Sequence, residues 1–192
     1  MPDTGHQMPN TGCQMPNTKY QIPDTKHRMP DTGNQQYSAM IKLTVERHNI
    51  NINKLVESAV KLHGHAGPYL NLGIKMGLLA LELLGAKGYF DLSTEVEVKN
   101  RTPFSCLIDG LQISTGCTLG KGNIKVKDEP GDNIRALFKT DHQALLVSLK
   151  PEVIRLLDFQ KESCEALGQQ ILEMSDKQLF TYEMKYEAEL TL

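Results

Sequence analysis

The chain has 192 residues, 40% of them hydrophobic and none of them Trp, and its formal net charge is −2. This length is enough for one folded domain with an aliphatic core. A nearly neutral chain lacks the excess positive charge that attracts nucleic acid or an anionic membrane surface. No apolar run approaches the roughly 18 residues that a membrane span requires. We therefore expect no nucleic-acid partner and no membrane partner.

The N-terminus consists of tandem seven-residue repeats, which read MPDTGHQ, MPNTGCQ, MPNTKYQ, IPDTKHR and MPDTGNQ. A proline in every unit forbids a continuous helix, and one apolar residue per unit cannot form a coiled-coil seam. We predict that residues 1–36 are a low-complexity, disordered tail and that residues 37–192 form the folded domain.

The four cysteines are widely spaced, and the first twenty residues are polar and Pro-rich, without the apolar segment of a secretory signal. A reducing, cytoplasmic location is therefore expected. In that compartment cysteines are thiols or metal ligands rather than disulfides.

The first predicted elements of the domain are mostly helical. Residues 37–45 are predicted as a short strand or an extended lead-in. Asn51 or Asn53 suits the N-cap of a helix that continues to Leu62. The segment HGHAGP at 63–68 interrupts it, and Pro68 suits the first turn of a second helix that runs to about Leu84 and ends at Gly85.

The remainder of the chain alternates strands and helices. Strands are predicted over 93–99, 124–127, 134–140 and 144–149, and a helix over about 104–115, closed by Gly116. One helix is predicted from Pro151 through Leu167, followed by a final strand or short helix over 179–190. This order predicts an α+β fold, with a mixed or antiparallel sheet packed with helices.

His63 and His65 lie at the break between the first two helices. On a loop flanked by glycine, both imidazoles can point into one cleft, and imidazole is a common ligand of Zn, Cu, Fe and Ni. The alternative is that one histidine caps the preceding helix and the other is a satisfied structural residue.

A second group of candidate residues lies in CLID and GCTLGKGN. Cys106 and Asp109 are three residues apart on the predicted helix, and Cys117 follows its end. Thiolate, imidazole and carboxylate together suit Zn, Ni, Fe or Cu, and Zn is the expected metal, with Ni or Fe as alternatives. Cys106 is equally well explained as a small buried hydrophobe. Cys117 is expected to bury little, and nearby Lys121 is expected to favour its thiolate form.

The glycine-rich loop fails the P-loop pattern, because Gly122 rather than Ser or Thr follows Lys121. A plain anion or ligand site formed by Gly120, Lys121 and Gly122 is the expectation that remains. His142 is expected to be exposed, and Cys164 is expected to be a core or interface residue.

HGHAGPYLNLGIKMG and CLIDGLQISTGCTLGKGN together resemble the two signature segments of the FmdE family, which takes its name from formylmethanofuran dehydrogenase. The resemblance covers roughly His63 to Leu149. It implies a dimeric α+β domain whose metal site combines the histidine loop with the cysteine loop. The implied ligands are His63, His65, Cys106, Asp109 and Cys117, with His65 and Cys117 foremost.

The chain departs from the family pattern at Gly67, where many members have cysteine, and it shows no paired-cysteine zinc ribbon of the kind that some relatives carry. The missing thiol argues against dithiol redox chemistry through that position. It does not affect the two histidines.

Three functional hypotheses follow. The first is a metal-binding protein linked to one-carbon metabolism and to a molybdenum or tungsten enzyme partner. The second is an enzyme that acts on a small molecule through Cys117 or a metal-bound water. The third is a non-catalytic accessory protein that delivers metal or cofactor. A homodimer is expected, partly because Gly73, Gly77 and Ala80 suggest close helix packing.

Overall fold

The computed structural model describes residues 51–158 and 163–186. The predicted repeat tail and the predicted element at 37–45 lie outside these residues. Helix α1 (Ile52–His63) begins where predicted, because the Asn51 side chain accepts hydrogen bonds from the backbone N–H groups of Asn53 and Lys54. Helix α2 (Pro68–Leu84) has proline in its first turn and ends at Gly85 in the left-handed conformation, as predicted.

Helix α2 is buried along most of its length because it packs closely against helix α3 (Cys106–Thr115). A Cβ atom added to Gly73 would stand 2.1 Å from the carbonyl oxygen of Leu107, and one added to Gly110 would stand 2.1 Å from that of Leu70. Farther along, a Cβ on Gly77 would stand 2.0 Å from Ser114 Oγ. The two helices therefore run in the same direction, with both N-termini at one end of the domain.

The five strands form one mixed sheet in the order β2-β1-β3-β4-β5. Strands β1 (Ser93–Val98) and β2 (Ile124–Asp128) are parallel and are joined through α3, whereas the other neighbouring strands are antiparallel. Strands β3 (Arg135–Lys139) and β4 (Gln143–Leu149) form a hairpin, and β5 (Phe180–Tyr186) adds to the edge of β4. The predicted α+β class is confirmed.

Two helices differ from the sequence-based prediction by more than one residue. Helix α3 begins at Cys106 rather than Phe104. The helix predicted from Pro151 through Leu167 is in fact two helices, α4 (Pro151–Asp158) and α5 (Cys164–Glu173). Ser163 explains the second start, because its side chain accepts a hydrogen bond from the backbone N–H of Ala166 as an N-cap. Helix α6 (Asp176–Leu179) then leads directly into β5.

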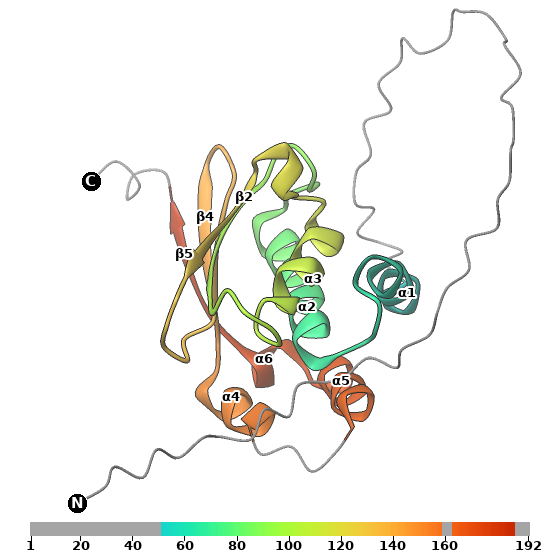
Figure 1. Ribbon diagram of the computed structural model, residues 1–192. Helices are drawn as coiled ribbons and strands as arrows, with labels where there is room; N and C mark the ends of the chain where they lie inside the picture. The colour runs from blue at the N-terminus through green and yellow to red at the C-terminus, as the bar shows by residue number, and fades with distance from the viewer. Residues whose placement is uncertain (1–50, 159–162, 187–192) are drawn as a thin grey trace, which may run out of the picture. The chain divides into compact units, whose positions relative to one another are not determined.

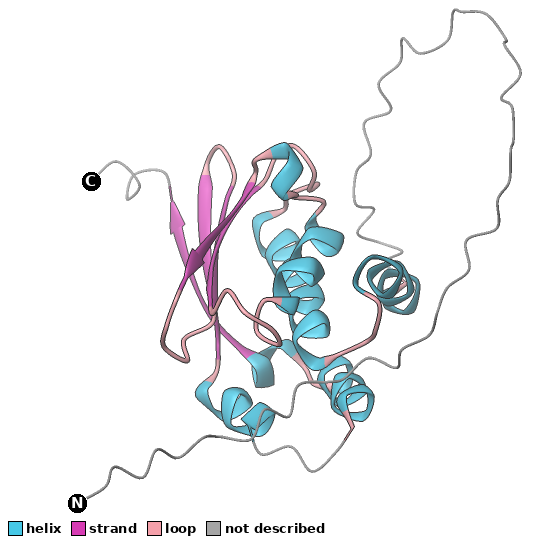
Figure 2. Ribbon diagram, in the orientation of Figure 1, coloured by secondary structure: helices cyan, strands magenta, loops and turns pink. Residues whose placement is uncertain are grey.

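Helices α1, α2, α3 and α5 lie on one side of the sheet (Figures 1 and 2). Helices α2 and α3 form the layer next to the strands, and α1 and α5 lie outside that layer. The main core between sheet and helices is largely aliphatic, with Phe138 fully buried in β3 and Tyr69 and Phe180 buried beside it. Within the described residues, no helix has the length and apolar character needed to cross a membrane.

Candidate metal centre

The two loop histidines are positioned by the junction between α1 and α2. His63 is the last residue of α1, and Gly64 ends that helix with φ of 100°, donating its N–H to the carbonyl of Val60. A residue with a side chain rarely adopts this conformation, so glycine is required at this position. The chain then turns through His65 to Pro68, where α2 starts. The two imidazole rings lie side by side, with their centroids 4.8 Å apart.

His63 is oriented by a carboxylate from a neighbouring helix. Its Nδ1 lies 2.7 Å from Oδ2 of Asp109, in the first turn of α3. A carboxylate only accepts hydrogen bonds, so Nδ1 carries the proton, and in the neutral imidazole Nε2 then has the lone pair. Asp109 is itself held by the Gln112 side-chain amide, whose Nε2 lies 3.2 Å from Oδ1. The lone-pair atom, His63 Nε2, is buried and has no hydrogen-bond partner.

His65 also has an open nitrogen. Its Nδ1 is buried without a hydrogen-bond partner. Burial lowers the pKa of His65, the neighbouring His63 lowers it further, and the charge of Glu165 acts in the opposite direction. The ring is therefore held in the neutral form, which is the form that binds metals. Two neighbouring imidazoles with unpartnered buried nitrogens are unusual, because buried polar atoms are normally satisfied.

The predicted cysteine ligands lie elsewhere. Cys117 follows the opposite end of α3, and the six residue-to-residue steps from Asp109 to Thr115 alone span roughly 9 Å of helix. Its side chain is fully buried, contrary to the sequence-based expectation, and its thiol donates to the carbonyl of Leu92 at 3.3 Å.

The thiol form of Cys117 is favoured by its surroundings. Burial raises the pKa of Cys117, and this effect outweighs the lowering influence of the neighbouring Thr115 and Thr94 side chains and of the positive charge of Lys121. Cys106, the first residue of α3, packs against the main core as a partly buried hydrophobe. The structure thus brings His63, His65 and Asp109 together and does not bring Cys117 to them.

The predicted anion loop forms the short 3-10 helix η2 (Leu119–Lys121) beyond the end of α3. The Lys121 ammonium donates to the carbonyl of Gly116 and lies over the rings of Tyr89 and Phe90, at 5.4 and 5.5 Å from their centroids. Gly120 and Gly122 face open space. The ammonium is thus engaged by a carbonyl oxygen and two aromatic faces.

The first turn of α5 faces the histidine loop, a relationship that sequence reasoning missed. A Cβ added to Gly67 would stand 3.1 Å from His65 Nε2 and 3.9 Å from Cys164 Sγ. Glu165, the next residue, is close enough to influence the pKa of His65. Cys164 is partly exposed rather than a core residue. Cys164 lies about 100 residues after the histidine loop in the sequence. No local sequence pattern could therefore indicate that the two are close in space.

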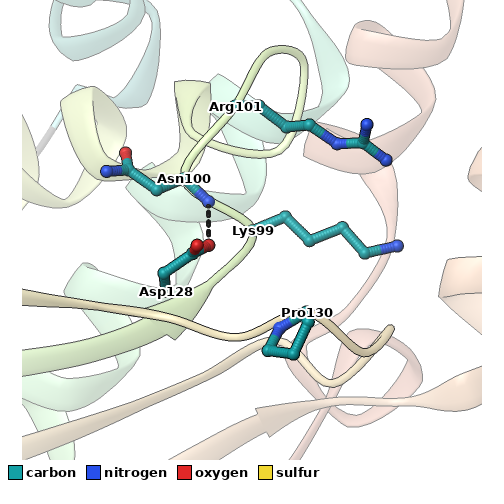
Figure 3. Close-up of a pocket in the computed structure, with 5 residues that line it drawn as sticks. All are labelled: Lys99, Asn100, Arg101, Asp128 and Pro130. Carbon is teal, nitrogen blue, oxygen red and sulfur yellow. Dashed lines mark hydrogen bonds between the residues drawn. The ribbon is translucent and has the colours of Figure 1, made fainter.

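A cavity of about 320 Å³ lies at the carboxyl ends of the parallel strands β1 and β2 (Figure 3). It is lined by Lys99, Asn100, Arg101, Asp128 and Pro130, and Asn100 donates its backbone N–H to Asp128 at 2.9 Å. The Lys99 ammonium and the Arg101 guanidinium lie 4.8 and 6.0 Å from the centre of the Phe104 ring. Lys99 is paired with Asp132.

The cavity and the histidine loop lie at the same end of the domain. Tyr69 follows Pro68 in the first turn of α2, and the edge of its ring packs on Phe104 with centroids 5.2 Å apart. No sequence pattern identified the cavity residues, because basic residues such as Lys99 and Arg101 after a strand are commonly just exposed to solvent.

The histidine pair fits a borderline transition metal, because two neutral imidazoles with open nitrogens are a preferred donor set for zinc and its neighbours. It supplies two ligands. Within residues 51–158 and 163–186, no three or more His, Cys, Asp or Glu side chains are gathered closely enough to hold a metal ion.

The fold and this site define a small α+β domain with a carboxylate-oriented histidine pair beside its helix layer. The chain belongs to the FmdE family, described as "FmdE, Molybdenum formylmethanofuran dehydrogenase operon", whose model matches residues 62–181. This confirms the family resemblance that the histidine and cysteine segments indicated. The match includes both histidines and the whole of strands β1 to β4.

Two similar proteins bear on the comparison. The chain is 31% identical over 127 residues to a probable S-adenosyl-L-methionine-binding protein of Archaeoglobus fulgidus, a match that covers 63% of this chain. It spans only about a third (33%) of that relative's length. The solved structure of a tungsten formylmethanofuran dehydrogenase FmdE-like protein from Syntrophus aciditrophicus has a TM-score of 0.53 at 20% identity, over 76% of this chain and 77% of that one. At this identity, the likeness supports the fold.

Proposed function

We propose that this chain is a metal-binding protein and that His63 and His65 are the primary ligands of a transition metal ion, with zinc as the preferred metal. The observation that carries the proposal is the pair of adjacent imidazoles whose buried nitrogens, His63 Nε2 and His65 Nδ1, have no hydrogen-bond partner. A bound cation would satisfy both atoms and offset the cost of burying them.

The contact between His63 and Asp109 supports the same proposal. Metal-binding histidines commonly donate the other ring N–H to a carboxylate, which fixes the tautomer and makes the ligating nitrogen more basic. In this chain Asp109 has that outer role, because its carboxylate accepts from Nδ1 and leaves Nε2 for the metal. The family resemblance implied Asp109 as a direct ligand, and we now propose it as a positioning residue.

When bound, the ion would act as a Lewis acid for water or for a small ligand. The chain's own residues would orient it: Asp109 holds the His63 tautomer, and Gln112 holds Asp109. The cavity beside Arg101 is the proposed place for a small anionic ligand, since no carboxylate among the described residues pairs with that guanidinium. An open coordination position would favour catalysis or ligand binding, whereas a closed one would favour an accessory role.

The cellular role is proposed from the family alone. We propose a cytoplasmic protein connected with one-carbon metabolism and with a molybdenum or tungsten enzyme, and a homodimer as its assembly. The structure removes one argument for the dimer, because Gly73 and Gly77 contact α3 of the same chain. Light scattering of the full-length protein tests the dimer directly.

The test of metal binding is calorimetric titration of metal-free, full-length protein with zinc. The wild type is expected to bind one equivalent, and His65→Gln is expected to lose that binding. His142→Gln is the matched control, because His142 is an exposed histidine in the turn between β3 and β4. Equal binding by the wild type and His65→Gln would exclude the proposed site.

A further inference from the structure

The sheet ends in two edge strands, β2 and β5, and no other strand of the described chain pairs with their outer sides (Figure 1). An edge strand presents unpaired backbone N–H and C=O groups, and proteins usually protect it with charges, proline or a bulge. Strand β2 is short and carries Lys125 and Lys127. Strand β5 contains no proline and pairs with β4 at every position without interruption. The edge at β5 is therefore the one that is open to another strand.

Strand β5 also displays two exposed tyrosines. Phe180 and Met184 pack against the main core, which lies between the sheet and the helices. Because side chains alternate along a strand, Tyr182 and Tyr186 point to that same side of the sheet. They are nevertheless 52% and 59% exposed, so the helices leave them uncovered. Tyrosine is enriched at protein–protein interfaces, and these two lie on the open edge strand.

The residue types of β5 are symmetric about Met184, in the order Tyr, Glu, Met, Lys, Tyr from 182 to 186. If two copies of β5 pair antiparallel about Met184, Glu183 of each copy stands opposite Lys185 of the other. Tyr182 of each copy then stands opposite Tyr186 of the other. Opposite charges and aromatic pairs in these positions stabilise a sheet.

Other registers of the same pairing lack this complementarity. A centre at Glu183 places glutamate opposite glutamate, and a centre at Lys185 places lysine opposite lysine. Like charges directly opposite each other are destabilising. A centre at Tyr182 places Glu183 opposite Thr181, so no charge pair forms. The side chains of β5 therefore favour the register about Met184.

Strand β2 does not offer the same contact. Two copies that paired about Val126 would place Lys125 of each opposite Lys127 of the other. A centre at either lysine would place that lysine opposite its own copy. Each of these registers sets lysine against lysine, which is a common protection of an edge strand.

We propose that β5 is the dimer interface of this protein, with two copies paired antiparallel about Met184 into one continuous sheet. The contact is isologous, because both copies use the same surface around a two-fold axis. The backbone groups of the edge supply hydrogen bonds, and the pairs between Glu183 and Lys185 fix the register. The inference rests on the homodimer proposed above, to which it adds the surface and the register.

The test is sedimentation velocity of metal-free, full-length protein over a concentration series. The wild type is expected to dimerise, and Lys185→Glu is expected to raise the dimer Kd about tenfold or more, because it sets glutamate against Glu183 twice. Glu183→Lys/Lys185→Glu exchanges the two charges and should restore the wild-type Kd. Lys139→Glu is the matched control, since Lys139 is an exposed lysine in the same cross-strand row but on the inner strand β3, and it should dimerise as the wild type does.

The outcomes separate this interface from the other proposals. A wild type that stays monomeric overturns both the interface and the homodimer. A dimer that Lys185→Glu leaves unchanged overturns the interface and leaves a homodimer formed through another surface. A folded double variant that stays as weak as Lys185→Glu overturns the register. Zinc titration of the same samples tests the histidine site separately, because Lys185→Glu should bind zinc as the wild type does.

Discussion

Asp109 Oδ2 lies 2.7 Å from His63 Nδ1 and joins the N-terminal turn of α3 to the last residue of α1. The contact sets the tautomer of His63 and leaves its Nε2 as the atom available for a metal. The first prediction concerns this contact. Asp109→Ala should weaken zinc binding about 10- to 100-fold, which is the usual effect of losing an outer-shell partner.

Calorimetric titration measures that loss, and Asp141→Ala provides a control because Asp141 is an exposed carboxylate in the β3–β4 turn. If Asp109→Ala abolished stoichiometric binding altogether, Asp109 would be a direct ligand, as the family resemblance implied. Unchanged affinity would remove Asp109 from the site.

A second prediction concerns the packing of α2 on α3. Gly110→Ala should lower the free energy of unfolding by about 3 kcal/mol or more, because the new methyl group would stand 2.1 Å from the carbonyl oxygen of Leu70. Gly120→Ala is the matched control, since nothing lies within 4 Å of its added Cβ, and its effect should stay within about 0.5 kcal/mol. Urea unfolding measures both, and similar values would contradict the described helix contact.

A third prediction separates Cys117 from the metal site. Cys117→Ala should lower the free energy of unfolding by about 1 kcal/mol, because it removes a buried sulfur from the core, yet leave zinc stoichiometry unchanged. Loss of metal in this variant, with the fold intact by circular dichroism, would restore Cys117 as a ligand.

A fourth prediction concerns the pH dependence of the metal-free protein. The folded-state pKa of His65 lies below its ordinary value of 6.5, so the unfolded chain binds the extra proton between these two pKa values. Stability therefore falls as the pH drops below about 6.5, and this part of the loss ends below the folded pKa. Urea unfolding at pH 7 and pH 5 should show a smaller difference for His65→Gln than for the wild type. A wild-type difference equal to or smaller than that of the variant would contradict the shift.

Local signals predicted most of the fold. Asn51, Pro68, Gly85 and Gly116 mark helix boundaries through side-chain or backbone capping, and each boundary is confirmed. The break between α4 and α5 was missed because apolar residues occur on both sides of it, while the N-cap at Ser163 is a weak signal. The parallel pairing of β1 with β2 depends on contacts far apart in the chain, which no local pattern encodes.

The candidate site was only partly predictable for the same reason. The spacing of His63 and His65 on a glycine-flanked loop indicated that the rings would meet, and they do. Cys117 was expected to bury little because it lies in a glycine-rich loop, but its side chain is fully buried in the core. Cys164 reaches the loop only through the packing of α5 on α2.

Metal content measured by elemental analysis tests the central claim most directly. Full-length protein purified without chelator is compared with the His63→Gln/His65→Gln double variant, with circular dichroism as the check that both are folded. The account predicts about one equivalent of zinc, nickel or iron per chain in the wild type and none in the double variant. A folded wild type without metal, or a double variant that retains a full equivalent, would contradict the claim that this histidine pair binds metal.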